Sequence, residues 1–112
     1  MQATLDHVFS ALSDPTRRSV VSRLAKGPCA TLELAKPFNM ALPSFTQHLN
    51  VLEKCGLVTS AKNGRVRTYE LKAETLSASE DWLSAQRRMW NTRLDQLDEF
   101  LTQLKEKHLD QN

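Results

Sequence analysis

Residues 32–72 read LELAKPFNMALPSFTQHLNVLEKCGLVTSAKNGRVRTYELK, and this stretch decides the fold that the sequence predicts. Two helical patterns come first, separated by a short turn. From Leu57 the apolar residues recur with a period of two, which is typical of strands. An Asn-Gly pair at 63–64, a strong hairpin signal, separates strands predicted over 57–62 and 65–71. Two helices followed by a hairpin predict a winged helix-turn-helix.

The second helical pattern, over 42–55, has an apolar side and a polar side. Its apolar residues Phe45, Leu49 and Leu52 lie at i, i+4 and i+7, the spacing of a buried stripe. The polar side chains beside and opposite this stripe are those of Ser44, Thr46, Gln47 and His48. A helix with such a polar side can enter the major groove of DNA, where side chains reach base edges.

The predicted hairpin is basic. It carries Lys62, Arg65 and Arg67, and no acidic residue lies between positions 61 and 69. Charge of this kind can simply keep an exposed hairpin soluble. Three unbalanced cations beside a polar helix nevertheless favour contact with DNA phosphates or with a narrow minor groove.

Two helices are predicted before this stretch, and a short third helix opens it and ends at Pro37. The second helix should begin with Asp14 as its cap and Pro15 in its first turn, where a missing N–H costs nothing. Arg17 and Arg18 follow directly. For these two arginines we favour a structural ion pair or a solvated surface over contact with phosphate.

After Glu74 the pattern is helical again, and Ser77 with Glu80 predicts a capping box at the start of this last helix. Residues at alternating spacings of four and three form a heptad seam, which consists of Leu83, Arg87, Trp90, Leu94, Leu97, Leu101, Leu104 and His108. A helix of about thirty residues is ~45 Å long, more than so small a domain can cover. We expect a second copy of the chain to cover the seam.

Composition predicts one ordinary globular domain over residues 1–112, with 40% hydrophobic and 25% charged residues. Residues 1–73 hold ten Lys/Arg and five Asp/Glu, a net charge of +5, whereas residues 74–112 hold five and eight, a net charge of −3. This asymmetry is typical of a nucleic-acid binder whose last segment has another task. With no signal peptide or membrane span in view, we expect a bacterial cytoplasmic protein in which Cys29 and Cys55 are free thiols.

Several strings of the chain resemble one known family. The stretches FSALSDPTRRSVVSRL (9–24), LAKPFNMALPSFTQHLNVLEKCGLV (34–58) and GRVRTYEL (64–71), in this order, resemble the ArsR/SmtB family of bacterial transcriptional repressors. The tail WLSAQRRMWNTRLDQLDEFL (82–101) resembles the metal-independent, SdpR-like branch of that family. The resemblance covers nearly the whole chain.

The resemblance implies a homodimer that represses by occupying a double-stranded DNA operator, with a reading head at about 31–72 and dimerisation helices at about 1–13 and 77–108. The base-reading positions of the family fall on Ser44, Thr46, Gln47 and His48. Its wing contacts fall on Lys62, Arg65 and Arg67. Its dimer interface falls on Leu5, Phe9, Trp90, Leu94, Leu97, Leu101 and Leu104.

This chain departs from the family pattern at the recognition helix. Ala41 takes the place of the usual Ser or Thr cap, and neutral Gln47 and Asn50 replace residues that are often basic in relatives. We therefore expect DNA affinity to depend more on the wing. For His48, a DNA contact and a partly buried hydrogen bond beside the apolar stripe are equally compatible with the sequence.

Metal-sensing members of the family carry Cys-x-Cys in the third helix, or paired Asp/His and His/Glu ligands in the last helix. Here the third helix reads TLELAK and the last helix has only His108, so neither ligand set is present. We therefore expect no metal and no other cofactor. A thiol-responsive repressor that uses Cys29 and Cys55 is an alternative, although dithiol sensors of the family place one cysteine in the last helix.

Two classes of function remain after this comparison. The first is a sequence-specific repressor, and the second is a winged-helix dimer that binds other proteins and no longer binds DNA. The polar recognition helix and the basic hairpin favour the first. No Gly-rich phosphate loop, metal constellation or activated nucleophile suggests an enzyme. The residues leave the inducer unidentified.

Overall fold

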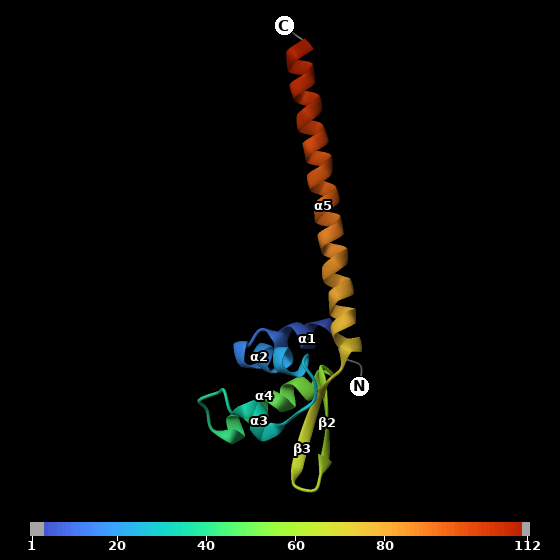
Figure 1. Cartoon of the computed structure of the whole chain (residues 1–112). Helices are drawn as coiled ribbons and strands as arrows, with labels where there is room; N and C mark the ends of the chain where they lie inside the picture. Colours follow the sequence, from blue (N-terminus) through green and yellow to red (C-terminus); the bar gives the residue numbers. More distant parts are fainter. Residues whose placement is uncertain (1–3, 111–112) are drawn as a thin grey trace. The chain divides into compact units, whose positions relative to one another are not determined.

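The structure is a computed structural model that describes residues 4–110, with side chains described through residue 108. The chain divides into two compact units, 1–79 and 80–112, and each is described by itself. The elements are α1 Leu5–Leu12, α2 Pro15–Leu24, β1 Cys29–Ala30, α3 Thr31–Ala35, α4 Leu42–Lys54, β2 Val58–Asn63, β3 Val66–Leu71 and α5 Ala73–Asp110 (Figure 1). The predicted mainly helical fold with a small β wing is confirmed.

The boundary between α1 and α2 lies where the sequence predicts it. Asp14 caps α2, since its Oδ2 accepts a hydrogen bond from the amide of Arg17 at 3.0 Å, and Pro15 occupies the first helical position. The carbonyls of the last turn of α1 accept hydrogen bonds from both arginines, from Arg17 Nε at Ala11 (2.6 Å) and from Arg18 Nη1 at Leu12 (2.8 Å). Cations at a helix C-terminus complement its dipole, so both arginines have a structural role, although through carbonyls and not through the ion pair that the sequence suggested.

α4 ends in a tight left-handed turn at Gly56. The amide of Leu57 donates to the carbonyl of Leu52 at 3.0 Å, and the amide of Gly56 donates to the carbonyl of Glu53 at 3.1 Å. Gly56 has φ +86°, which glycine adopts without the penalty that a Cβ would bring. These two bonds form a Schellman motif, which stops the helix and turns the chain into β2.

The hairpin turn lies one residue later than predicted. β2 and β3 pair from Val58 with Leu71 to Asn63 with Val66, so the two-residue loop is Gly64-Arg65 and not Asn63-Gly64. Gly64 has φ +65°, and among the described residues only glycines have positive φ. A loop with positive φ at its first position alone matches the Gly-X hairpin pattern, whereas an Asn-Gly turn needs positive φ at both.

A third strand, β1, is absent from the sequence prediction. Its two residues, Cys29 and Ala30, pair antiparallel with Tyr69 and Thr68 at the free edge of β3, which gives the sheet order β1-β3-β2. A two-residue strand has no periodicity of its own. It forms because β3 offers an unpaired edge beside it.

The buried side of α4 forms a large part of the core of unit 1. The predicted stripe of Phe45, Leu49 and Leu52 is fully buried, with 0% exposure. The rings of Phe38 and Phe45 lie 5.2 Å apart, and Tyr69 of β3 joins the same cluster. Burial of each such side chain stabilises the fold by about 1.5–3 kcal/mol, so the recognition helix is held by the core and not by its own propensity.

α5 begins earlier than predicted, so the predicted capping box at Ser77 and Glu80 is wrong. Both residues lie inside the helix, which starts at Ala73. The start is set by tertiary bonds: the amide of Lys72 donates to the carbonyl of Leu57 at 2.8 Å, and Thr75 Oγ1 donates to the carbonyl of Gly56 at 2.6 Å. These bonds join the first turn of α5 to the end of α4.

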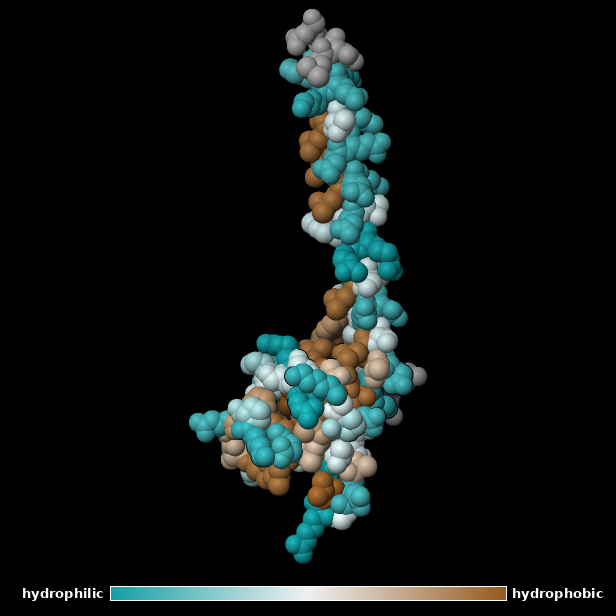
Figure 2. All heavy atoms as spheres, viewed as in Figure 1, coloured by the Kyte–Doolittle hydropathy of each residue, from teal (hydrophilic) through white to brown (hydrophobic). Residues whose placement is uncertain are grey.

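Unit 2 consists of the remainder of α5, and no helix among the described residues is long and apolar enough to cross a membrane. Its large apolar side chains are 42–64% exposed in the single chain, and they are Trp82, Leu83, Met89, Trp90, Leu94, Leu97, Phe100, Leu101 and Leu104. Figure 2 shows apolar residues on one side of this helix.

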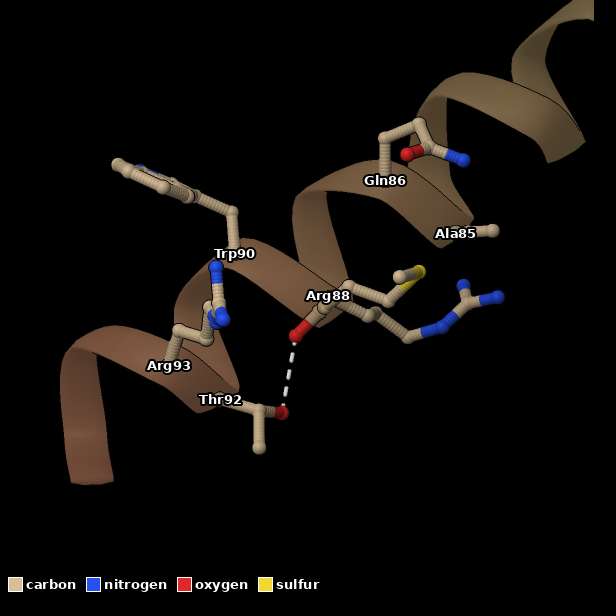
Figure 3. A pocket seen from close by; sticks show the side chains of 7 residues that line it. Ala85, Gln86, Arg88, Trp90, Thr92 and Arg93 are labelled. Carbon is tan, nitrogen blue, oxygen red and sulfur yellow. Dashed lines mark hydrogen bonds between the residues drawn. The ribbon is translucent and has the colours of Figure 1, made fainter.

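A hollow of about 720 Å³ lies along unit 2, and its lining residues all come from α5. They are Ala85, Gln86, Arg88, Met89, Trp90, Thr92 and Arg93. Trp90 and Arg88 point to different sides of the helix, and Thr92 Oγ1 donates to the carbonyl of Arg88 at 2.9 Å (Figure 3). A hollow lined by one helix has no second wall, so it is an open surface and not an enclosed ligand site.

Candidate nucleic-acid interface

The outer side of α4 carries the predicted base-reading residues. Ser44, Gln47 and Asn50 are exposed, whereas Thr46 is half-buried beside the core stripe. Ala41 is the N-cap of α4 and makes no side-chain capping bond, because its methyl group has no hydrogen-bond acceptor. The amide and hydroxyl groups of Ser44 and Gln47 therefore face solvent from a helix whose opposite side is fixed in the core.

His48 is held by a cluster at the corner between α1 and α2. Arg17 Nη1 lies 3.0 Å from His48 Nδ1, and Asp14 Oδ2 lies 3.8 Å from the same nitrogen. Because a guanidinium can only donate, Nδ1 accepts this bond, and the proton of the neutral ring is then on Nε2. The partly buried hydrogen bond considered for His48 is thus observed. Its Nε2–H can serve only acceptors, such as a phosphate oxygen or the N7 and O6 of guanine.

Asp14 supports this corner electrostatically. Its pKa is lowered from the ordinary value chiefly by the hydrogen bond from the amide of Arg17, while burial opposes the shift and nearby His48 and Arg17 add to it. The carboxylate therefore stays ionised in the folded protein at neutral pH. It caps the start of α2, where its Oδ2 accepts from the amide of Arg17.

The three cations of the wing have different environments. Arg65 lies in the two-residue turn at the tip, and Lys62 and Arg67 are direct cross-strand neighbours on the same face of the hairpin. All three are exposed. The Arg67 guanidinium is engaged within the protein, since its Nη1 donates to Ser60 Oγ at 2.8 Å.

The sequence interpretation did not single out Ser60 or Glu53. Ser60 Oγ donates to Glu53 Oε2 at 2.6 Å, which connects β2 with α4. Neither residue belongs to a motif, and the pairing depends on the turn at Gly56 that brings β2 back along α4. The one available signal was that Glu53 is the sole acidic residue between positions 34 and 69.

Among residues 4–110, no group of three or more His, Cys, Asp or Glu side chains is placed to hold a metal ion. Cys29 and Cys55 are both free and buried, each 6% exposed. Cys55 Sγ donates to the carbonyl of Leu52 at 3.3 Å, at the C-terminal end of α4. In this fold both thiols are packed as small apolar side chains.

The comparisons with known proteins agree with this geometry. A family model described as a helix-turn-helix domain matches residues 12–61. The transcriptional repressor SdpR of Bacillus subtilis is 33% identical over 79 residues, which cover 70% of this chain and 88% of SdpR. The transcriptional regulator Rv2034 of Mycobacterium tuberculosis is 42% identical over 73 residues, covering 65% of this chain and 68% of that protein. A solved structure of an ArsR-family transcriptional regulator is 49% identical, with a TM-score of 0.74 over 78% of this chain and 96% of that one.

Proposed function

Because this chain belongs to the ArsR family of transcriptional regulators, we propose that it is a sequence-specific repressor that binds an inverted-repeat operator as a homodimer. It is a DNA-binding regulator and not an enzyme. The observation that carries the finer proposal is the outer side of α4, where Ser44 and Gln47 are exposed on a helix locked into the core. A bidentate amide at Gln47 suits the N6 and N7 of adenine, and Ser44 can bond a base edge or a phosphate.

Backbone binding is assigned to the wing and to the flanks of α4. Lys62 and Arg65 are exposed cations on a hairpin next to the recognition helix. The net charge of +5 over residues 1–73 supports the same assignment, because cations that neutralise phosphates release counterions. Thr46 and the Nε2–H of His48 supply further donors at the edge of α4.

A second copy of the chain is the occupant that we propose for the apolar side of α5. Unit 2 contains one helix, and its seam residues Trp90, Leu94, Leu97, Leu101 and Leu104 are 42–61% exposed in the single chain. An isolated helix is marginal in water, so a helix with such a seam gains most of its stability from a partner. Leu5 and Phe9 of α1 are half-buried and are proposed to extend the interface.

The charges beside the seam support an antiparallel pair of α5 helices. Glu80, Arg87, Asp98 and Lys105 are exposed on one side of α5, with Arg87 in the seam itself, and none of them forms an ion pair among the side chains described through residue 108. With the two-fold axis near Thr92, Arg87 meets the partner's Asp98 and Glu80 meets the partner's Lys105. In the same register Leu94 meets the partner's Trp90.

Other arrangements bring like charges together. Sliding the antiparallel pair by one heptad places Arg87 beside the partner's Lys105, and sliding it the other way places Glu80 beside the partner's Asp98. A parallel, in-register pair stacks Arg87 on the partner's Arg87. Like charges at such positions select against a pairing, so one register is favoured.

We assign no metal to the repressor, because the family's two ligand sets are missing from the third and last helices. Its proposed location is the bacterial cytoplasm, where operator DNA lies. The test is selection of bound fragments from genomic DNA, followed by footprinting and sedimentation. The expected result is a protected inverted repeat with half-sites about one helical turn (~34 Å) or a multiple apart, bound by a dimer. A folded protein that selects no DNA would favour the protein-binding alternative.

A further inference from the structure

Two hydrogen bonds in series connect the recognition helix with both strands of the wing. Ser60 Oγ of β2 donates to Glu53 Oε2 of α4 at 2.6 Å and accepts from Arg67 Nη1 of β3 at 2.8 Å. We call this the Glu53–Ser60–Arg67 chain. A serine hydroxyl has one proton, and here the carboxylate takes it, so the cation on the other side must be the donor. Both bonds involve a charged group and have the short lengths typical of such bonds.

The Glu53–Ser60–Arg67 chain reduces repulsion between like charges within the hairpin. Lys62 and Arg67 lie directly opposite each other in the register of β2 and β3, and like charges at such positions repel. Ser60 lies diagonally across the ladder from Arg67, on the side away from the tip. Through Ser60, the Arg67 guanidinium is connected to the carboxylate of Glu53, whose charge is opposite.

The backbone of Arg67 is fixed as well. Thr31 Oγ1, in the first turn of α3, donates to the carbonyl of Arg67 at 3.1 Å. The hydroxyl of Thr31 in α3 therefore bonds directly to the backbone of Arg67, whereas α4 is connected to the side chain of Arg67 only through Ser60. Tyr69, two residues from Arg67 on β3, is 2% exposed. Burial raises the pKa of Tyr69, and the charge of Glu53 adds to this shift while that of Arg67 opposes it.

We propose that Arg67 and Ser60 are positioning residues, which hold the wing in a fixed orientation to the recognition helix so that Lys62 and Arg65 reach DNA. Arg67 itself is not a phosphate contact, although the sequence pattern suggests that it is. The inference rests on the proposed DNA-binding function. It gives Ser60, which lies two residues farther from the tip than Lys62, an indirect role in DNA binding.

A double-mutant cycle on operator binding tests this proposal with the full-length protein. Ser60→Ala and Arg67→Ala are each expected to weaken operator affinity roughly three- to ten-fold. The double variant should bind no more weakly than the weaker single variant, because both substitutions break the same hydrogen-bonded connection between Arg67 and Glu53. Ser60→Thr keeps the hydroxyl and suits a strand, so it should bind within about two-fold of the wild type.

The salt dependence of binding separates positioning from contact. Ser60→Ala removes no charge, yet it should lower the slope of log affinity against log salt as much as Arg67→Ala does. In both variants Lys62 and Arg65 lose their contacts with DNA phosphates. If Arg67 instead contacts phosphate, Ser60→Ala leaves affinity and slope unchanged, and the proposal is overturned. Additive losses in the cycle would overturn it as well.

Two controls keep these outcomes distinct from loss of the fold or of the function. Thermal unfolding of Ser60→Ala and Ser60→Thr should be cooperative, so that a difference in affinity between them reports the hydroxyl. If the wild type selects no operator at all, the proposed function fails. If the wild type binds and Ser60→Ala binds equally well, this inference alone fails.

Discussion

At Gln47, exposure and helix position together define what the side chain can do. It lies on the side of α4 opposite the buried stripe of Phe45, Leu49 and Leu52, and its amide has no hydrogen-bond partner among the described residues. A free amide on a fixed helix can make two parallel hydrogen bonds to one base, whereas His48 offers a single donor because Arg17 occupies its other nitrogen. Gln47 can therefore discriminate between bases more strongly than His48 can.

Gln47→Ala should relax discrimination at one position in each half-site. The expected loss is ~1–3 kcal/mol on the preferred sequence and little on random DNA, because base contacts specify while phosphate contacts position. Fluorescence anisotropy with operator variants measures it. Gln96→Ala, at an exposed glutamine of α5, is the matched control. An equal loss on operator and random DNA would show that Gln47 does not read bases.

Asp14 makes the stability of the corner depend on pH. Asp14→Ala should lower the free energy of unfolding by about 0.5–2 kcal/mol at neutral pH, the usual cost of losing an N-cap. Because the folded-state pKa of Asp14 is lowered, its contribution is fully present above the ordinary aspartate pKa and is lost as pH falls through the lowered value. Urea unfolding across this range should show the two proteins converging in acid. Asp14→Asn, which keeps a capping oxygen, should lie between them, and a gap independent of pH would contradict the assignment.

At the scale of elements, the part of α5 in unit 2 differs from the other helices, because among residues 4–110 that unit holds no second element to pack against. α1 and α4 each bury apolar residues in the core, whereas the apolar seam residues of α5 from Leu83 to Leu104 are exposed in the single chain. In the antiparallel register proposed above, Arg87 lies beside the partner's Asp98 and Glu80 beside the partner's Lys105.

A charge exchange on α5 tests this register. Arg87→Asp and Asp98→Arg should each raise the dimer dissociation constant roughly ten-fold, because each places like charges side by side at two symmetric positions. The double variant Arg87→Asp with Asp98→Arg should restore dimerisation. Sedimentation equilibrium gives the constants, and Gln103→Asp, on the opposite side of the helix, controls for added charge. A double variant no better than the singles would show that another register is used.

For the whole molecule, DNA binding is proposed for unit 1 and dimerisation chiefly for unit 2, with Leu5 and Phe9 of unit 1 proposed to extend the interface. The net charges of +5 over residues 1–73 and −3 over residues 74–112 follow the same division. A dissociable pairing helix would make operator affinity depend on protein concentration, since one reading head alone binds a single half-site.

Operator release by metals or thiol reagents is a property of the whole molecule, and we expect none through a dedicated site. Stoichiometric Zn²⁺, Ni²⁺ or arsenite should leave the complex intact, because neither ligand set of the metal-sensing relatives is present. Cys29→Ser and Cys55→Ser should bind as the wild type does under reducing conditions. Anisotropy titrations with and without chelator measure both effects. Tight metal binding coupled to release, or release by a mild oxidant, would show a sensor site.

Local features were determined by the sequence alone. The stripe of α4, the cap at Asp14 and the stop at Gly56 each depend on residues within a turn or two of one another, so periodicity and residue type were enough to predict them. The winged helix-turn-helix, the recognition helix and its polar side follow from these features. The interpretation that Arg17 does not contact phosphate also followed from its place just after the start of a helix.

Features that need two distant segments were decided by the tertiary structure. The bond from Arg17 to His48 joins residues 31 apart, and the bond from Thr31 to the carbonyl of Arg67 joins residues 36 apart. β1 and the early start of α5 also depend on surfaces that exist only after folding. Arg67 is the clearest example. Its charge was visible in the sequence, but the partner of that charge, Glu53 through Ser60, depends on the turn that lays the wing against α4, and no local pattern encodes that distance.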